Sequence, residues 1–79
     1  MDASIVQVQH EPAREIVRDA RGIVIGVIER QRLVGRLIAR DARGVVVGAY
    51  EERSRTTPDR HGRLVGRTNL LLALLLRER

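Results

Sequence analysis

Residues 16–29 read IVRDARGIVIGVIE and residues 38–51 read IARDARGVVVGAYE, so the chain carries nearly the same segment twice. Nine of the fourteen aligned positions are identical, and equivalent residues such as Asp19 and Asp41 lie 22 residues apart. A fainter third copy, PDRHGRLVGRT at 58–68, keeps the spacing D-x-x-G-x-x-x-G. Repetition of this kind indicates one supersecondary unit that is used several times.

The spacing of Asp and Gly in each copy is typical of a tight turn between two strands. Asp is favoured at the first position of a type I turn, and a Gly three residues later adopts the left-handed conformation of a three-residue hairpin loop. β-Branched runs flank each turn, so each copy predicts a β-hairpin. The hairpins cover about residues 14–30, 33–53 and 57–76, and the predicted turn residues are Asp19, Gly22, Asp41, Gly44, Asp59 and Gly62.

We therefore predict an all-β fold in one domain, residues 1–79: a meander of repeated β-hairpins that forms a small sheet or a barrel-like assembly. With residues 42–44 as the loop, Ala39 pairs with Val47 and Ile38 pairs with Gly48. The first copy likewise sets Ile16 beside Gly26, and such a Gly admits the bulky neighbour or strengthens the twist. Alternation along the strands then predicts an apolar face made of Leu33, Leu37, Ala39, Val45, Val47 and Ala49, with Arg36, Arg40, Tyr50 and Glu52 on the other face.

The C-terminal segment TNLLLALLLRER at 68–79 has two interpretations. Thr68 or Asn69 can cap a helix, which Leu and Ala favour. Seven apolar residues in a row show no helical stripe, however, and are typical of a strand covered on both faces. The strand is slightly favoured because the preceding RLVGRT matches the outgoing arm of each hairpin.

A chain of 79 residues with no Cys, no Phe and one Tyr has a thin core and no disulfide or thiolate metal site to supplement it. We therefore expect a homo-oligomer, most simply around a two-fold axis, in which open sheet edges and the C-terminal leucines meet a second copy. The predicted oligomer contacts are Leu70, Leu71, Leu72, Leu74, Leu75 and Leu76.

The formal charge is +5, and all 15 basic residues are Arg. Genomic base composition explains this uniform usage, and selection for a basic ligand-binding surface is the alternative. Four Arg recur at equivalent places in the first two copies and are predicted to point to one side of the sheet, where guanidinium groups could hold phosphates or carboxylates. The alternative is a solvated face neutralised by Glu29, Glu51 and Glu52. The four candidate anion-binding residues are Arg14, Arg18, Arg36 and Arg40.

We expect no enzyme activity, no catalytic residues, no cofactor and no metal site. His10 and His61 are far apart and lie in or beside predicted turns, and no G-K-[ST] phosphate loop follows any Gly. The longest apolar run has seven residues, whereas about 18 are needed to span a bilayer, and no secretory signal is visible. A cytoplasmic protein is expected.

Two resemblances follow from these motifs. The D-x-x-G-x-x-x-G hairpins with an apolar C-terminal run, over about residues 14–76, resemble short bacterial β-hairpin repeat proteins of unknown function, which implies a fold and no activity. The ending DRHGRLVGRTNLLLALL, residues 59–75, is similar to the strand-strand-helix close of a cystathionine-β-synthase-type (CBS) domain. That resemblance implies paired modules that bind adenosine nucleotides, although the tail begins sooner after LVG than in that family.

Three functions are therefore predicted in order. The first is a structural or protein-interaction module that self-associates or binds a partner protein through its sheet edges. The second is an anion-binding module, with nucleic acid as the expected target. The third is an adenosine-nucleotide-binding module of the CBS type.

Overall fold

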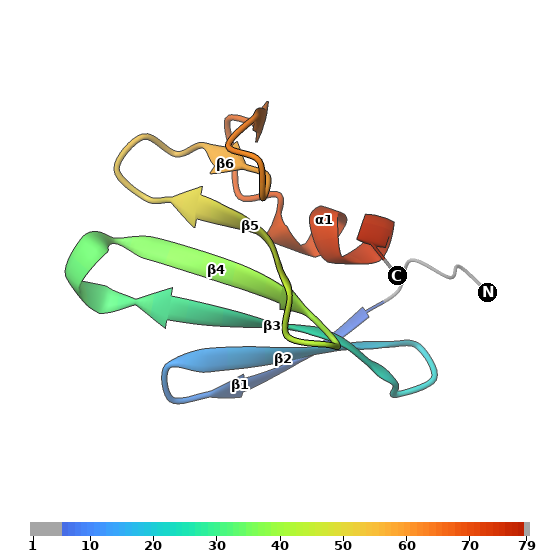
Figure 1. Ribbon diagram of the computed structural model, residues 1–79. Helices are drawn as coiled ribbons and strands as arrows, with labels where there is room; N and C mark the ends of the chain where they lie inside the picture. Colours follow the sequence, from blue (N-terminus) through green and yellow to red (C-terminus); the bar gives the residue numbers. More distant parts are fainter. Residues whose placement is uncertain (1–5, 79) are drawn as a thin grey trace.

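The computed structural model describes residues 6–78 and is mostly β-structure (Figure 1). Five antiparallel strands form a meander sheet in chain order: β1 Val6–Glu11, β2 Arg14–Asp19, β3 Val24–Gln31, β4 Arg36–Asp41 and β5 Val46–Glu51. A smaller sheet contains β6 Thr57–Pro58 and β7 Leu64–Gly66. A 3-10 turn, η1 Arg32–Val34, joins β3 to β4, and the chain ends in α1 Leu71–Glu78. The predicted meander of hairpins is confirmed, and the described strands do not close into a barrel.

The three predicted turns are confirmed. In each turn the Gly N–H donates to the Asp carbonyl, at 2.9, 2.9 and 3.0 Å in chain order. The Asp41 Oδ1 also accepts from the N–H groups of Arg43 and Val45 at 2.9 and 3.0 Å, and the other two Asp residues make the equivalent bonds. The φ angles are 84°, 86° and 80° at Gly22, Gly44 and Gly62.

The register of the hairpins differs from the prediction by one residue beyond the turn. A β-bulge lies between Ala39 and Arg40, so Ala39 pairs with Gly48, one residue beyond the predicted partner. The first hairpin has the same irregularity, and the predicted pair of Ile16 with Gly26 is also wrong. A bulge sets two residues of one strand against one of the other, and hydrophobic alternation alone does not reveal it.

The predicted apolar face is therefore correct only in part. Leu33 is fully exposed on η1, Val45 is exposed just after its turn, and Ala49 moves to the opposite face with the shifted register. Tyr50, predicted on the arginine side, pairs with Leu37 and packs against the core. The buried core consists of Val17, Ile25, Ile28, Ala39, Val47, Leu71, Leu74 and Leu75.

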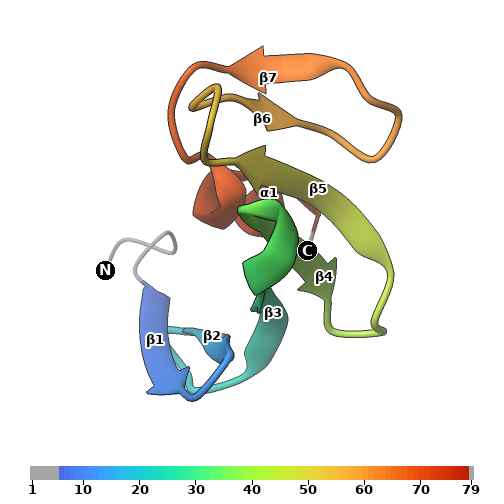
Figure 2. The same ribbon diagram turned by 90° about the vertical axis from the view of Figure 1, so that its left-hand side faces the viewer.

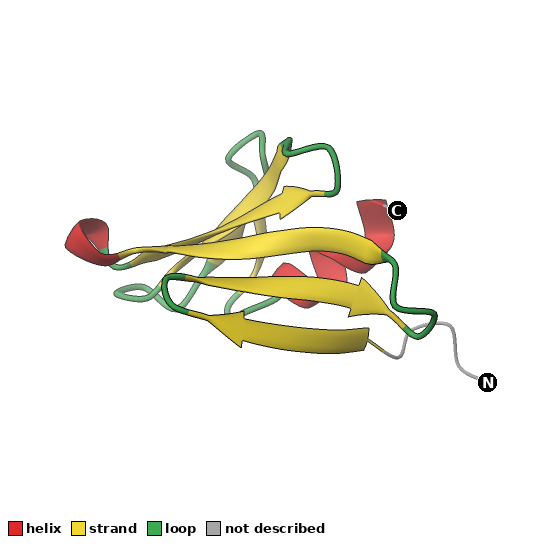
Figure 3. Ribbon diagram, turned by 90° about the horizontal axis from the view of Figure 1, so that it is seen from below, coloured by secondary structure: helices red, strands yellow, loops and turns green. Residues whose placement is uncertain are grey.

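The C-terminal segment forms α1, so the slightly favoured strand is wrong. Asn69 Oδ1 accepts from the N–H of Leu71 at 3.1 Å and caps the first turn. The curved row of strands wraps around α1 (Figure 2), which covers one face of the large sheet (Figure 3). Because strands surround the helix on more than one side, its sequence lacks the single apolar stripe of a surface helix.

The second Gly of each copy seats one leucine of the C-terminal segment. A Cβ placed on Gly26 would lie 2.5 Å from Leu75 Cδ2, and one on Gly48 would lie 2.5 Å from Leu74 Cδ1. In the third copy, a Cβ on Gly66 would collide with Leu70 Cδ1. The glycines are therefore required for the approach of the C-terminal leucines, not for the neighbouring isoleucines that the sequence suggested.

Candidate interaction surfaces

The four predicted anion-binding arginines lie on the face of the sheet opposite α1, where most of them have acidic partners. Arg14 Nε lies 3.0 Å from Glu11 Oε1, and Arg40 Nε donates to Glu29 Oε1 at 2.6 Å. Arg36 Nε lies 2.6 Å from Glu51 Oε1 as an ion pair without hydrogen-bond geometry.

The fourth member of this arginine face, Arg18, has a backbone partner. Its Nη1 donates to the carbonyl of Gly22 at 3.1 Å, and Arg40 makes the equivalent bond to Gly44 at 3.2 Å. The face therefore combines ion pairs with bonds that brace the turns, and anion binding there remains a prediction.

The six leucines predicted as oligomer contacts divide into two groups. Leu71, Leu74 and Leu75 are fully buried in the core of the same chain, so they are not available on the surface of the folded monomer. Leu72 is 37% exposed, and Leu70 and Leu76 are half-buried. A contact with a second copy therefore remains a prediction for these last three.

The meander brings all three D-x-x-G turns to one end of the molecule, because alternate connections of a meander lie at the same end. The β2–β3 and β4–β5 turns carry the sequence DARG. The third turn lies beside them, since Asp59 bridges to Gly48 and the N–H of Arg60 donates to the carbonyl of Val47 at 3.1 Å. Neighbouring strands lie about 4.8 Å apart, so equivalent points of the two DARG turns are separated by about 10 Å.

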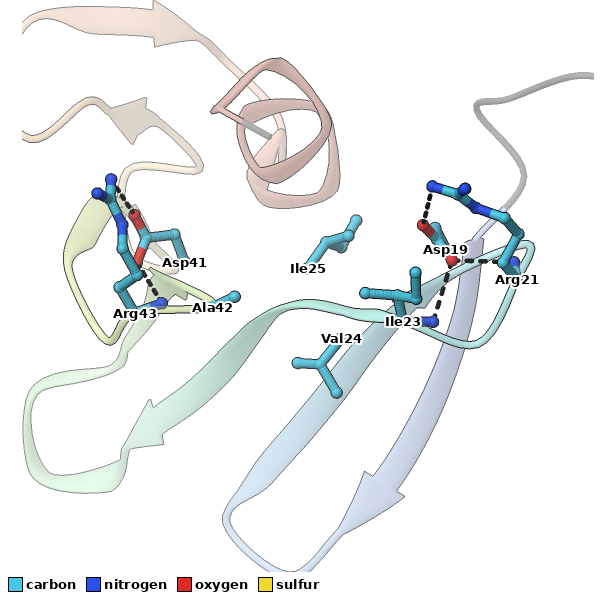
Figure 4. Close-up of a pocket in the computed structure, with 8 residues that line it drawn as sticks. All are labelled: Asp19, Arg21, Ile23, Val24, Ile25, Asp41, Ala42 and Arg43. Carbon is cyan, nitrogen blue, oxygen red and sulfur yellow. Dashed lines mark hydrogen bonds and ion pairs between the residues drawn. The ribbon is translucent and has the colours of Figure 1, made fainter.

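An open groove of about 530 Å³ lies between the two DARG turns. Figure 4 shows one Asp–Arg pair on each side of Ile25, which points toward α1. We call this feature the turn groove; it is lined by Asp19, Arg21, Ile23, Val24, Ile25, Asp41, Ala42 and Arg43.

The charges of the turn groove are arranged with the carboxylates inside and the guanidinium groups outside. The side chains of Asp19 and Asp41 are 7% and 12% exposed, whereas those of Arg21 and Arg43 are 80% and 86% exposed. Each Arg Nη2 lies 3.8 or 3.7 Å from the Asp of its own turn, beyond hydrogen-bond distance. The turn groove therefore presents two positive groups above an apolar floor.

Backbone N–H groups stabilise the ionised form of the turn carboxylates. The N–H of Val45 has the largest effect in lowering the pKa of Asp41; partial burial opposes it, and the N–H and charge of Arg43 add to the lowering. The pKa of Asp59 is lowered in the same way, chiefly by the N–H of Arg63. The negative charge of each of these carboxylates is therefore stabilised mainly by N–H groups of its own turn.

Sequence reasoning missed Arg21 and Arg43 as candidate binding residues, although a signal was present. Both copies read D-A-R-G, and a turn requires only the Asp and the Gly, so the identical Arg is not explained by the turn itself.

The histidines do not come together: His10 Nδ1 lies 2.6 Å from Glu15 Oε2, and His61 is exposed in the third turn. Within residues 6–78 no cluster of His, Asp and Glu is suited to hold a metal ion.

Strand β1 forms one edge of the large sheet. It reads VQVQHE, pairs with β2 on one side, and has no partner strand on its outer side within the described part of the chain. The strand carries no Arg, although the chain has 15. Its outer backbone groups are therefore free to pair with another strand.

Comparison with protein-family models, with curated proteins and with solved structures finds no match to this chain. The one α-helix of the described residues, with eight residues, is too short to cross a membrane.

Proposed function

We propose that the chain is a non-enzymatic structural module that self-associates into a two-fold homodimer through the open edge of β1. The observation that carries the proposal is this edge. Sheet edges are normally protected by Lys, by Pro, by bulges or by a covering element, because an exposed edge pairs with other chains. Residues Val6–Gln9 of β1 have none of the protecting side chains and no charge.

The edge is self-complementary. If the two-fold axis passes through Val8, antiparallel pairing places Val8 opposite Val8 of the second copy and Gln7 opposite Gln9. Like apolar and like amide side chains then meet at the centre of the contact, an arrangement that favours pairing, and Val6 lies opposite His10 on either side of it. Two chains with a formal charge of +5 repel each other, but β1 brings no Arg into the contact.

The exposed side of α1 also supports dimerisation through β1. Successive helical residues are rotated by about 100°, so if Leu71 defines 0°, the three leucines seated on glycines lie at about −100° (Leu70), −60° (Leu74) and +40° (Leu75). These meet the third, second and first copies in order. Leu72 and Leu76 follow at about 100° and 140°, on the side of the first copy where β1 ends the row of strands. A second copy paired along β1 extends the sheet in that direction and covers both leucines.

Solution mass tests the proposal. We expect light scattering coupled to size exclusion to give twice the chain mass of 8.9 kDa at micromolar concentration. Added salt should leave the dimer intact or strengthen it, because salt screens the repulsion between two basic chains. A monomer at all concentrations would contradict the proposal.

Two proline variants separate the edge from the fold. A two-residue loop closes the β1–β2 hairpin, so alternation from that loop directs the N–H of Gln9 toward β2 and the N–H of Val8 outward. Val8→Pro should therefore give a folded monomer, whereas the control Gln9→Pro should lose stability by breaking a bond inside the sheet. Leu72→Glu should also give a folded monomer. Dimers that persist in both Val8→Pro and Leu72→Glu would overturn the proposed contact.

A further inference from the structure

The turn groove combines exposed positive charge with exposed apolar surface. Arg21 and Arg43 are exposed at equivalent positions of the two repeats, each beside the Asp of its own turn (Figure 4). Between them, Ile23 is 54% exposed and Ile25 forms part of the floor. An isolated surface Arg is ordinary, but two that flank one apolar groove, in segments that repeat the same four letters, form a shaped site.

We propose that the turn groove binds an acidic peptide segment, with an apolar side chain of the peptide against Ile23 and Ile25 and its carboxylates on Arg21 and Arg43. Clusters of Arg recognise acidic motifs through charge-assisted hydrogen bonds. The guanidinium groups are exposed, and their Nη2 atoms lie 3.8 and 3.7 Å from Asp19 Oδ2 and Asp41 Oδ2, beyond hydrogen-bond distance, so their N–H groups can donate to the carboxylates of such a ligand. The formal charge of +5 attracts an acidic partner to the whole chain.

The apolar floor favours a peptide over a nucleic acid. A phosphate backbone would contact the arginines alone and leave Ile23 exposed to water. Proteins that bind single strands add aromatic side chains on which bases stack. The single aromatic residue here, Tyr50, packs against the core instead.

The test uses a fluorescent peptide in which Glu and Leu alternate, with binding followed by anisotropy. Two control peptides separate the contributions: alternating Glu and Ser removes the apolar side chains, and alternating Lys and Leu reverses the charge. We expect measurable binding of the Glu–Leu peptide, weaker binding of the Glu–Ser peptide and none of the Lys–Leu peptide. Equal binding of the Glu–Ser peptide would overturn the role of the apolar floor and with it the proposal.

Matched variants locate the site. Loss of one exposed ion pair weakens binding by about two- to fivefold, so Arg21→Gln with Arg43→Gln should raise the Kd about tenfold. The control, Arg53→Gln with Arg55→Gln, removes the same charge from exposed arginines of the loop after β5, at the other end of the sheet. An equal loss in both double variants would show that only net charge matters and would overturn the site.

A second pair of variants tests the apolar contact. Ile23→Ser should weaken binding several-fold, whereas Val45→Ser should not, because Val45 follows the other DARG turn and does not line the groove. Binding of a labelled DNA duplex in place of the Glu–Leu peptide, with the same loss in Arg21→Gln, would overturn the peptide and identify a phosphate site. The proposal is independent of self-association, since Val8→Pro should change the solution mass and leave the peptide Kd unchanged.

Discussion

Gly26 offers the sharpest test of how α1 is seated. In Gly26→Ala the new methyl carbon would lie 2.5 Å from the carbonyl oxygen of Arg40 and 2.5 Å from Leu75 Cδ2. The first of these atoms belongs to the backbone of β4, the neighbour of β3 in the sheet. Rotation of a side chain therefore cannot relieve the overlap, and either the two strands or the helix must move.

Overpacking of this kind costs about 1–3 kcal/mol. Replacing Gly by Ala also reduces the entropy of the unfolded chain, which offsets the cost by about 0.4–1 kcal/mol. With mid-range values of about 2 kcal/mol for the overpacking and about 0.7 kcal/mol for the entropy, the net loss of stability is about 1.3 kcal/mol. At about 4–8 °C per kcal/mol for a domain of this size, we expect the Tm to fall by about 5–10 °C.

The assay is thermal unfolding followed by circular dichroism, with Gly66→Ala as the matched control. A Cβ at Gly66 meets only the side chain of Leu70, which is half-buried and can change rotamer. We expect a smaller loss of Tm in the control than in Gly26→Ala. An unchanged or raised Tm in Gly26→Ala would refute the close seat of α1 on the first repeat.

Three further changes test the turns and the start of the helix. Gly44→Val forces a β-branched residue to φ 86° and should cost about 1–3 kcal/mol in urea unfolding; an unchanged midpoint would contradict the turn. The pKa values of Asp41 and Asp59 are lowered in the folded state, so both groups stabilise the fold at pH values above their ordinary pKa of 3.8. The unfolding free energy should therefore hold from pH 7 to about pH 5 and decline below about pH 4. Asp41→Asn should weaken that decline, and a variant with the wild-type pH profile would contradict the role of the Asp41 carboxylate. Thr57 is fully buried, and its Oγ1 donates to Thr68 O at 2.6 Å and accepts from Leu70 N at 3.1 Å. Thr57→Val keeps the shape of the side chain but removes both bonds, so it should lower the unfolding free energy by about 1–3 kcal/mol. Wild-type stability of this variant would show that the two bonds do not stabilise the start of the helix.

The turns could be predicted from sequence because their chemistry is local. Asp41 and Gly44 lie three residues apart, and the bonds that they make stay within that turn. The bulge beside Ala39 could not be predicted in the same way, because it concerns the pairing of two strands, and one extra residue changes which side chains share a face. The error over Ala49 and Tyr50 follows directly from that shift.

The C-terminal helix was the less favoured of two interpretations for a related reason. A run of leucines is apolar on every side, and its conformation depends on what surrounds it rather than on its own period. The information was present in Gly26, Gly48 and Gly66, which recur four residues after the turn glycines, but only the structure identifies the leucine that each one admits. A Gly within a strand indicates the close approach of another group, and the sequence alone does not say of which.

The arginine face illustrates what strand alternation can and cannot establish. Alternation correctly places Arg14, Arg18, Arg36 and Arg40 on one side of the sheet. It does not indicate which cross-strand neighbour each one meets, and the ion pair of Arg40 with Glu29 joins two strands. Arg21 and Arg43 lie in turns, where alternation does not apply, and there the repeated sequence itself was the better guide.

The contacts between the repeats and α1 also limit how further strands can be added to the sheet. In most repeat proteins each unit contacts only its neighbours, so further copies can be added at either end. Here each D-x-x-G-x-x-x-G copy has its own leucine from one C-terminal segment, and Leu70, Leu74 and Leu75 are already used. A fourth hairpin beyond β1 would meet Leu72 and Leu76 on the next side of the helix, but within residues 6–78 the sheet ends there with the single strand β1. A second copy of the whole chain can provide the missing strands, and for this reason we expect growth by association through β1 rather than by a longer repeat.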